Sequence, residues 1–101
     1  MIDILNEINM GEIGIDDAYR IYDEIMDRFH NGNLNVFPRE ELCMDNFEWT
    51  AFAHGASLET IADWRKNGWP KTCANCDQTL DYKKYGWRIE ADRLRCIKCI
   101  E

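Results

Sequence analysis

Four of the five cysteines of this chain form two close pairs near its carboxyl end, Cys73 with Cys76 and Cys96 with Cys99. Two residues separate the members of each pair, and 19 residues separate the two pairs. A spacing of two lets a tight turn direct both sulfurs at one point, and pairs about 15–20 residues apart are typical of zinc sites. Four thiolates brought together by a hairpin form the tetrahedron that zinc prefers. We therefore expect these four cysteines to hold one structural Zn²⁺ ion.

This predicted site has four protein ligands and no open coordination position, so its role would be structural and not catalytic. Iron is the alternative metal, and unligated or disulfide-bonded cysteines are the alternative without a metal. The fifth cysteine, Cys43, lies between Leu42 and Met44, and we expect it to be a small buried apolar residue. We recognise no nucleophile–base pair and no phosphate-binding loop in the sequence, so we do not expect an enzyme.

The cysteine pairs resemble those of the zinc-ribbon (rubredoxin-like) group over about residues 71–101, with the knuckles Cys-Ala-Asn-Cys and Cys-Ile-Lys-Cys. Asp77 and Ile100 stand where a glycine often follows the second cysteine of such a knuckle. The residue pattern between the pairs predicts two strands, over residues 87–90 and 93–95, joined by a tight turn at Ala91-Asp92. This hairpin would carry the second cysteine pair.

Residues 16–30 form the clearest predicted helix, because apolar side chains recur there at helical spacing. We expect Asp16 or Asp17 to be its N-cap, since a carboxylate there accepts hydrogen bonds from the first turn. Asn31-Gly32 should end it, because both residues tolerate the left-handed conformation.

Shorter helices are expected in the next part of the chain, over residues 38–44, 46–54 and 58–67. The sequence Asp45-x-x-Glu48 is typical of a capping box, and Ser57 is a suitable N-cap for the last helix. Residues 1–14 are ambiguous, because two glycines interrupt any long element there.

These elements predict an α+β fold, with an N-terminal bundle of three to four helices over residues 1–70 packed against a small C-terminal zinc-ribbon β-hairpin over residues 71–101. The boundary is expected near Pro70, where helical periodicity is lost. The segment there is short and aromatic, so the two subdomains should form one compact domain. A chain of 101 residues has a limited core, and a metal cross-link would stabilise it.

Net charge also differs between the two predicted subdomains. Residues 1–68 carry 14 acids and 5 bases, a net charge of −9, whereas residues 69–101 carry 5 acids and 7 bases, a net charge of +2. Five acids form one face of the clearest helix: Asp16, Asp17, Asp23, Glu24 and Asp27. A solvated surface is the ordinary interpretation of such a face. The functional interpretation is a partner-binding surface that steers a basic protein.

A nucleic-acid-binding regulator is the alternative function. Residues 47–67 can be aligned with a helix-turn-helix, but the second helix carries as many acids as bases, and a packed helical hairpin explains the pattern as well. Basic and aromatic side chains also alternate along the predicted ribbon, at Lys83, Lys84, Tyr85, Trp87, Arg88, Arg93 and Arg95. That alternation is typical of single-strand-binding surfaces, although burial of the aromatic rings against the helices explains it too. A subunit of a larger complex is a third interpretation.

No run of about 18 apolar residues occurs, so no membrane-spanning segment is expected. The N-terminal residues are acidic, unlike a secretory signal, and we expect a cytoplasmic protein. The segments 48–55 and 64–70 are rich in aromatic residues, and the first cysteine pair follows them directly. Over about residues 45–99, this arrangement resembles small uncharacterised bacterial proteins, some encoded beside secreted toxins. Together with the net charge of −9 over residues 1–68, this resemblance predicts an immunity or inhibitor protein that binds a basic toxin or nuclease.

Overall fold

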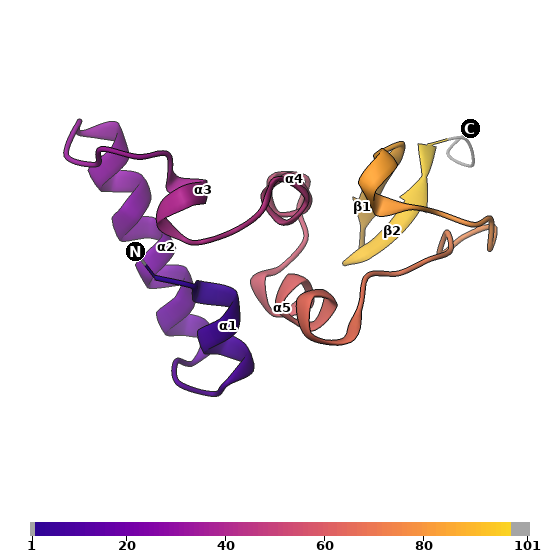
Figure 1. Ribbon diagram of the computed structural model, residues 1–101, viewed down its shortest axis with the longest axis horizontal. Coiled ribbons are helices and arrows are strands. Elements are labelled where there is room, and N and C mark those ends of the chain that lie inside the picture. The colour runs from indigo at the N-terminus through magenta and orange to yellow at the C-terminus, as the bar shows by residue number, and fades with distance from the viewer. Residues whose placement is uncertain (1, 98–101) are drawn as a thin grey trace.

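The computed structural model describes residues 2–97 and has the expected α+β architecture. Its elements in chain order are α1 (Ile4–Asn9), α2 (Ile15–His30), α3 (Pro38–Glu41), α4 (Asn46–Ala53), α5 (Leu58–Asn67), the 3-10 helix η1 (Tyr82–Lys84), β1 (Trp87–Glu90) and β2 (Arg93–Cys96). Helices and hairpin occupy opposite ends of an elongated molecule of 43 × 29 × 19 Å (Figure 1). Helix α1 lies in the stretch that the sequence pattern left ambiguous.

Helix α2 begins earlier than the sequence predicts. Its N-cap is Gly14, which makes no side-chain hydrogen bond to the helix, so the prediction that Asp16 or Asp17 is the N-cap was wrong. Ile15 packs against the core, and the helix therefore includes it. The two aspartates lie in the first turn, where their charge still complements the positive end of the helix dipole.

The predicted caps of the later helices are confirmed. Asp45 and Glu48 form a reciprocal capping box at the start of α4, with N–H···O distances of 2.7 and 2.9 Å. The Ser57 hydroxyl accepts a hydrogen bond from the Thr60 N–H at the start of α5. Helix α3 is shorter than expected, because Cys43 adopts a left-handed conformation (φ 57°) that turns the chain after Glu41.

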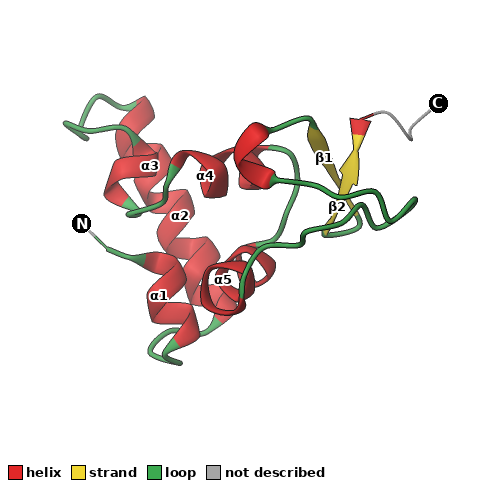
Figure 2. Ribbon diagram, turned by 45° about the vertical axis from the view of Figure 1, so that its right-hand side comes forward, coloured by secondary structure: helices red, strands yellow, loops and turns green. Residues whose placement is uncertain are grey.

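The core lies among the helices, where α1 packs on α5 and α2 runs across both (Figure 2). Its buried residues are Ile4, Leu5, Ala18, Ile25, Leu42, Met44, Ala51, Ala56, Leu58, Ile61, Ala62, Trp64, Trp87 and Leu94. Trp87 and Leu94 come from the hairpin and extend this core into the ribbon. No helix in the described part of the chain is long and apolar enough to cross a membrane.

The hairpin forms as predicted, with β1 antiparallel to β2 and Trp87 opposite Cys96. Ala91 and Asp92 have φ angles of 52° and 61°, which are typical of the type I′ turn that matches the twist of a hairpin. Strand β2 continues one residue further than expected and includes Cys96. The ladder therefore fixes the position of that cysteine.

Aromatic side chains join the helices to the ribbon. The rings of Trp69 and Tyr82 are stacked, with centroids 4.2 Å apart and planes at 9°. Trp64 of α5 contacts Trp69 on the helical side, and Phe47 of α4 meets Tyr82 edge to face at 5.3 Å. Each such pair contributes about 0.5–1.5 kcal/mol beyond the burial of its area. The chain across Pro70 is thus held by ring contacts on both sides.

Candidate metal centre and binding surfaces

Three of the four predicted ligands lie together. The sulfur atoms of Cys73, Cys76 and Cys96 all lie within 4.8 Å of one another, and those of Cys76 and Cys96 are 3.6 Å apart. That separation is far longer than a disulfide bond of about 2.05 Å. It is close to the roughly 3.8 Å between two sulfurs of a tetrahedral site with metal–sulfur bonds of about 2.3 Å. The three cysteines could therefore hold one metal ion. Cys99 lies outside the described residues.

The first cysteine pair lies on a small loop that is fastened to the hairpin. Thr72 and Thr79 pair across the base of the loop, and the Cys73 N–H donates to the carbonyl of Gln78 at 2.8 Å. The Ala74 N–H donates to the carbonyl of Leu94 at 2.9 Å, which connects the loop to β2. These backbone hydrogen bonds bring the pair close to Cys96.

Asp77 takes the place that a glycine often has after the second cysteine of a knuckle. Its φ angle is 58°, in the left-handed region that glycine adopts freely. Aspartate is one of the few other residues that visit this region routinely. The turn thus forms without the glycine, and its N–H donates to the carbonyl of Cys73 at 3.0 Å.

Backbone N–H groups also point at a sulfur. Cys73 Sγ accepts hydrogen bonds from the N–H groups of Asn75 at 3.4 Å and of Cys96 at 3.3 Å. N–H donors stabilise the charged thiolate, the form that binds metals. The donor set is therefore suited to a thiolate-bound ion. Cys43 belongs to another part of the molecule and is partly buried, not fully as expected.

No protein-family model matches the chain, and comparisons with curated proteins and with solved structures find no significant match. The likeness to zinc ribbons and to immunity-type proteins consequently stays a prediction from sequence. What the geometry adds is a group of three cysteines, with Cys96 on the antiparallel hairpin and Cys73 and Cys76 on the loop fastened to it.

The five predicted partner-binding acids, Asp16, Asp17, Asp23, Glu24 and Asp27, are all exposed on α2. At 3.6 residues per turn they lie within about a third of the helix circumference, opposite the buried Ala18 and Ile25. Within the described chain only Asp17 of the five has an ion pair, with Arg20 at 2.9 Å. Tyr22 lies on the other, partly buried side of α2, and burial, and secondly the charge of Asp23, raise its pKa.

The basic and aromatic residues of the ribbon differ in how far they are exposed. Trp87 is 6% exposed, and its ring N–H donates to the carbonyl of Tyr82 at 2.9 Å. Arg88 and Arg95 both pair with Glu90. Lys83, Lys84, Tyr85, Arg88 and Arg93 are exposed, whereas Arg95 is partly buried.

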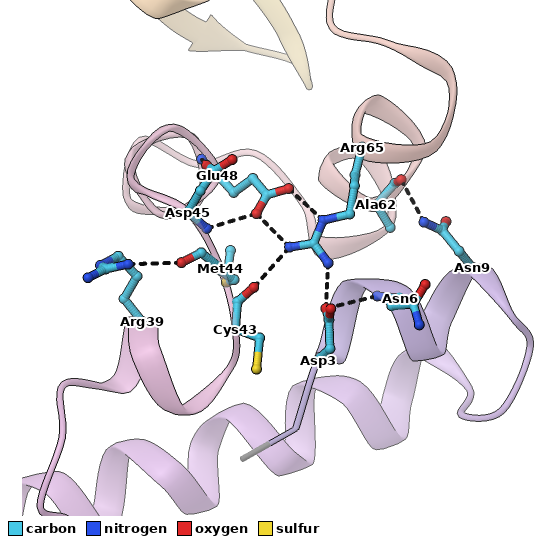
Figure 3. Close-up of polar contacts among 10 residues, drawn as sticks. All are labelled: Asp3, Asn6, Asn9, Arg39, Cys43, Met44, Asp45, Glu48, Ala62 and Arg65. Atoms are coloured by element: carbon cyan, nitrogen blue, oxygen red, sulfur yellow. Dashed lines mark hydrogen bonds and ion pairs between the residues drawn. The ribbon is translucent and has the colours of Figure 1, made fainter.

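A cavity of about 660 Å³ lies where α4 and α5 meet the ribbon. Trp64, Trp69 and Tyr82 form its aromatic wall, and Arg65 and Glu48 lie beside them. The Arg65 guanidinium is already bound by protein groups (Figure 3). It donates to both carboxylate oxygens of Glu48, at 2.6 and 2.7 Å, to the carbonyl of Cys43 at 3.0 Å, and to Asp3.

This network connects α5 to the start of α1, to the loop after α3 and to α4 (Figure 3). Glu48 is only 3% exposed, and its hydrogen bonds to Arg65 are the main cause that raises the pKa of that guanidinium. Arg65 therefore holds the helices together. The sequence pattern did not reveal this role, although Arg65 follows the buried Ile61 by four residues and so lies on the same face of α5.

A second cavity, which the sequence also did not reveal, lies between α2, α3 and α4. It has a volume of about 340 Å³, and its apolar lining residues are Met26, Phe29, Phe37, Pro38 and Trp49. Phe37 is 65% exposed. The only sequence signal was the apolar character of the loop that ends in Phe37-Pro38, because a pattern of residue types does not indicate which loop rings remain uncovered.

Proposed function

We propose that this protein is a small zinc-stabilised protein-binding module, an inhibitor of the immunity type that covers a basic toxin or nuclease. The observation that carries the proposal is the exposed acidic face of α2, formed by Asp16, Asp17, Asp23, Glu24 and Asp27. Carboxylates on such a face attract a cationic partner and take the place of the phosphates that a nuclease binds. The protein acts by binding and not by catalysis.

Zinc is the proposed ion, and Cys99 its fourth ligand. Cys99 follows Cys96 at the same spacing that separates Cys73 from Cys76. Thiolate ligands select zinc or iron over hard cations such as calcium and magnesium. When bound, the ion would cross-link the loop of the first pair to β2. We place the protein in the cytoplasm, where thiols stay reduced and available to the metal.

Several contacts favour a protein partner over nucleic acid. Trp87 is buried, and Arg88 and Arg95 are paired with Glu90, so these residues are less available for stacking or for phosphate contact. The exposed residues of α5 include Glu59 and Asp63, which would repel a DNA backbone in a helix-turn-helix arrangement. The exposed Lys83, Lys84 and Arg93 leave nucleic-acid binding as the alternative to be tested.

Affinity capture with two matched variants tests the proposal. One variant carries D23N, E24Q and D27N in the acidic face, and the control carries E12Q, E59Q and D63N, which are exposed acids outside α2. Both variants change the net charge by the same amount. At about 0.15 M salt, the wild-type protein and the control should retain a basic protein from nuclease-treated extract, and the α2 variant should lose it.

Two results would contradict the proposal. Equal loss of the partner in both variants would mean that net charge, and not the α2 face, governs binding. Recovery of nucleic acid alone from untreated extract, lost when Lys83, Lys84 and Arg93 are changed to alanine, would establish the nucleic-acid alternative.

A further inference from the structure

We infer that the cavity between α2, α3 and α4 is the anchor site of the proposed partner interface, and that it receives one large apolar side chain from a basic segment of the partner. This inference rests on the proposed function and adds the chemistry of the docking segment. The cavity and the acidic face of α2 are neighbouring surfaces, and the two together define what can bind.

The size and lining of the cavity fit an apolar anchor. Its volume of about 340 Å³ is at the lower end of the roughly 300–1,000 Å³ of small-ligand pockets, so it accepts a side chain and not a folded element. Met26, Phe29 and Trp49 form its walls. The Phe37 ring also lines the cavity, and its centroid lies 6.1 Å from the ring centroid of Phe29. Buried aromatic or aliphatic anchors that fill such pockets dominate the affinity of most protein interfaces.

Helix geometry brings the acids to the rim of the cavity. Asp23 precedes Met26 by three residues, so the two side chains are neighbours on the surface of α2. Asp27 follows Asp23 by four residues and continues the acidic row beside the apolar row of Met26 and Phe29. A segment that inserts an apolar side chain would therefore place its flanking residues against carboxylates.

The one basic residue in the lining of this cavity, within the described chain, is Arg39, and protein groups hold it. Its guanidinium donates to the carbonyl of Met44 at 3.1 Å and to Glu40 at 3.5 Å. The charges that face an incoming segment are thus mainly negative. This sign favours lysine or arginine beside the anchor, and it disfavours the acidic helices of a second copy of this chain, whose net charge is −7.

Two synthetic peptides test the inference. In one, a tryptophan lies between lysines, and in the other a glycine replaces the tryptophan, so that their charges are equal. We expect the tryptophan peptide to bind the wild-type protein at least about tenfold more tightly in low salt, as is typical of a buried aromatic anchor. Amide NMR shifts should move around Met26, Phe29, Phe37 and Trp49.

Phe37→Ser and Met10→Ser provide a matched comparison, because the two side chains are 65% and 62% exposed and neither change should unfold the protein. Phe37→Ser should abolish the preference for tryptophan, and Met10→Ser should keep it. Equal binding of the two peptides to the wild-type protein would overturn the anchor site. The same conclusion would follow if both serine variants behaved alike.

The D23N, E24Q and D27N variant separates this inference from the proposed function. If the variant lowers the affinity for both peptides, and the two peptides bind equally well, the role of the acidic face is supported and the anchor site is contradicted. If the variant changes neither affinity, and the preference for the tryptophan peptide remains, the anchor site is supported and the role of the acidic face is contradicted. Self-association of the wild-type protein that Phe37→Ser abolishes would overturn the inference in favour of a second copy as the occupant.

Discussion

The helical region and the ribbon are stabilised in different ways. Twelve of the fourteen clustered core residues in the described chain belong to the helical region, and the ribbon adds only Trp87 and Leu94. So little burial cannot offset the conformational entropy of ordering the ribbon. We therefore expect the ribbon to depend on cross-links, namely the stacked rings of Trp69 and Tyr82 and the metal ion proposed for the cysteine site.

The two regions also use ion pairs differently. In the helical region Arg65 meets a carboxylate, Glu48, that is almost completely buried, and two further segments meet the same guanidinium at Asp3 and Cys43. In the ribbon Arg95 and Arg88 meet Glu90, which is exposed to water. Water screens the second arrangement much more than the first, so similar chemistry should have unequal effects on stability.

Loss of the metal should have the largest effect. Zinc binding to thiolate sites contributes on the order of 10 kcal/mol to folding at neutral pH. Chelation or Cys96→Ser should therefore unfold the ribbon while the helical core keeps its structure. Far-UV circular dichroism should change little, whereas amide signals of residues 71–97 should collapse towards random-coil positions. Cys43→Ser is the control, because Cys43 lies outside the cysteine group.

Native mass spectrometry supplies the second part of this test. The wild-type chain should carry one zinc ion, and acid should release it, because protons compete with the metal for the thiolate ligands. A folded ribbon with every thiol free would contradict the zinc site. Simultaneous unfolding of the helices on chelation would contradict the separation of the two regions.

Arg65→Met should have the next largest effect. Removing one partner of a buried ion pair typically costs about 3–5 kcal/mol, because the remaining charge of Glu48 is left uncompensated. Urea denaturation of the helical region should show this loss. Arg20→Met is the control, since Arg20 and Asp17 are both exposed, and it should cost less than about 1 kcal/mol.

A double variant sharpens this prediction. Adding Glu48→Leu to Arg65→Met removes the uncompensated charge, so it should recover part of the lost stability. If Arg65→Met were no more harmful than Arg20→Met, the network around Arg65 would not be what holds the helices together.

Local signals in the sequence predicted most of the helices and strands but not the tertiary contacts between them. The Asp45–Glu48 box and the Ala91-Asp92 turn depend on neighbouring residues only, so residue types suffice to predict them. The predicted N-cap of α2 was wrong because packing of Ile15 competed with the capping preference of Asp16. Tertiary contacts override such local preferences.

The candidate sites also differ in whether local sequence patterns are enough to predict them. Cys73, Cys76 and Cys96 could be predicted to converge, because their spacing encodes the geometry of a metal site. The partners of Arg65 come from positions as distant as Asp3, and no local pattern connects them. The exposed ring of Phe37 was unpredictable for a related reason, since exposure depends on how the helices pack around it.

Ala91→Gly should stabilise the ribbon alone. Ala91 has a φ angle of 52°, where a side chain costs roughly 1–2 kcal/mol that glycine avoids. Glycine also gains entropy in the unfolded chain, so the net gain should be up to about 1 kcal/mol, or about fivefold in zinc affinity. Ala74→Gly in the first cysteine loop is the control, because Ala74 has no positive φ angle to relieve. An equal gain in the control would contradict strain at the turn.

The smallest expected effect concerns the exposed ion pairs of the ribbon. The hydrogen bond from Arg95, and secondly the one from Arg88, lower the pKa of Glu90 below its usual value of 4.5. Their stabilising contribution is therefore present above that pH and is lost as the pH falls through the lowered pKa. Arg95→Gln should raise the pKa of Glu90 more than Arg88→Gln does, as an NMR titration of the carboxylate would show.

Because Glu90 is exposed, neither substitution should measurably change the unfolding of the helical region. A loss of stability in Arg95→Gln as large as that in Arg65→Met would mean that the Glu90 pair is shielded from water much as Glu48 is. The two regions would then share one mode of stabilisation, because charge pairing in the ribbon would matter as much as its cross-links.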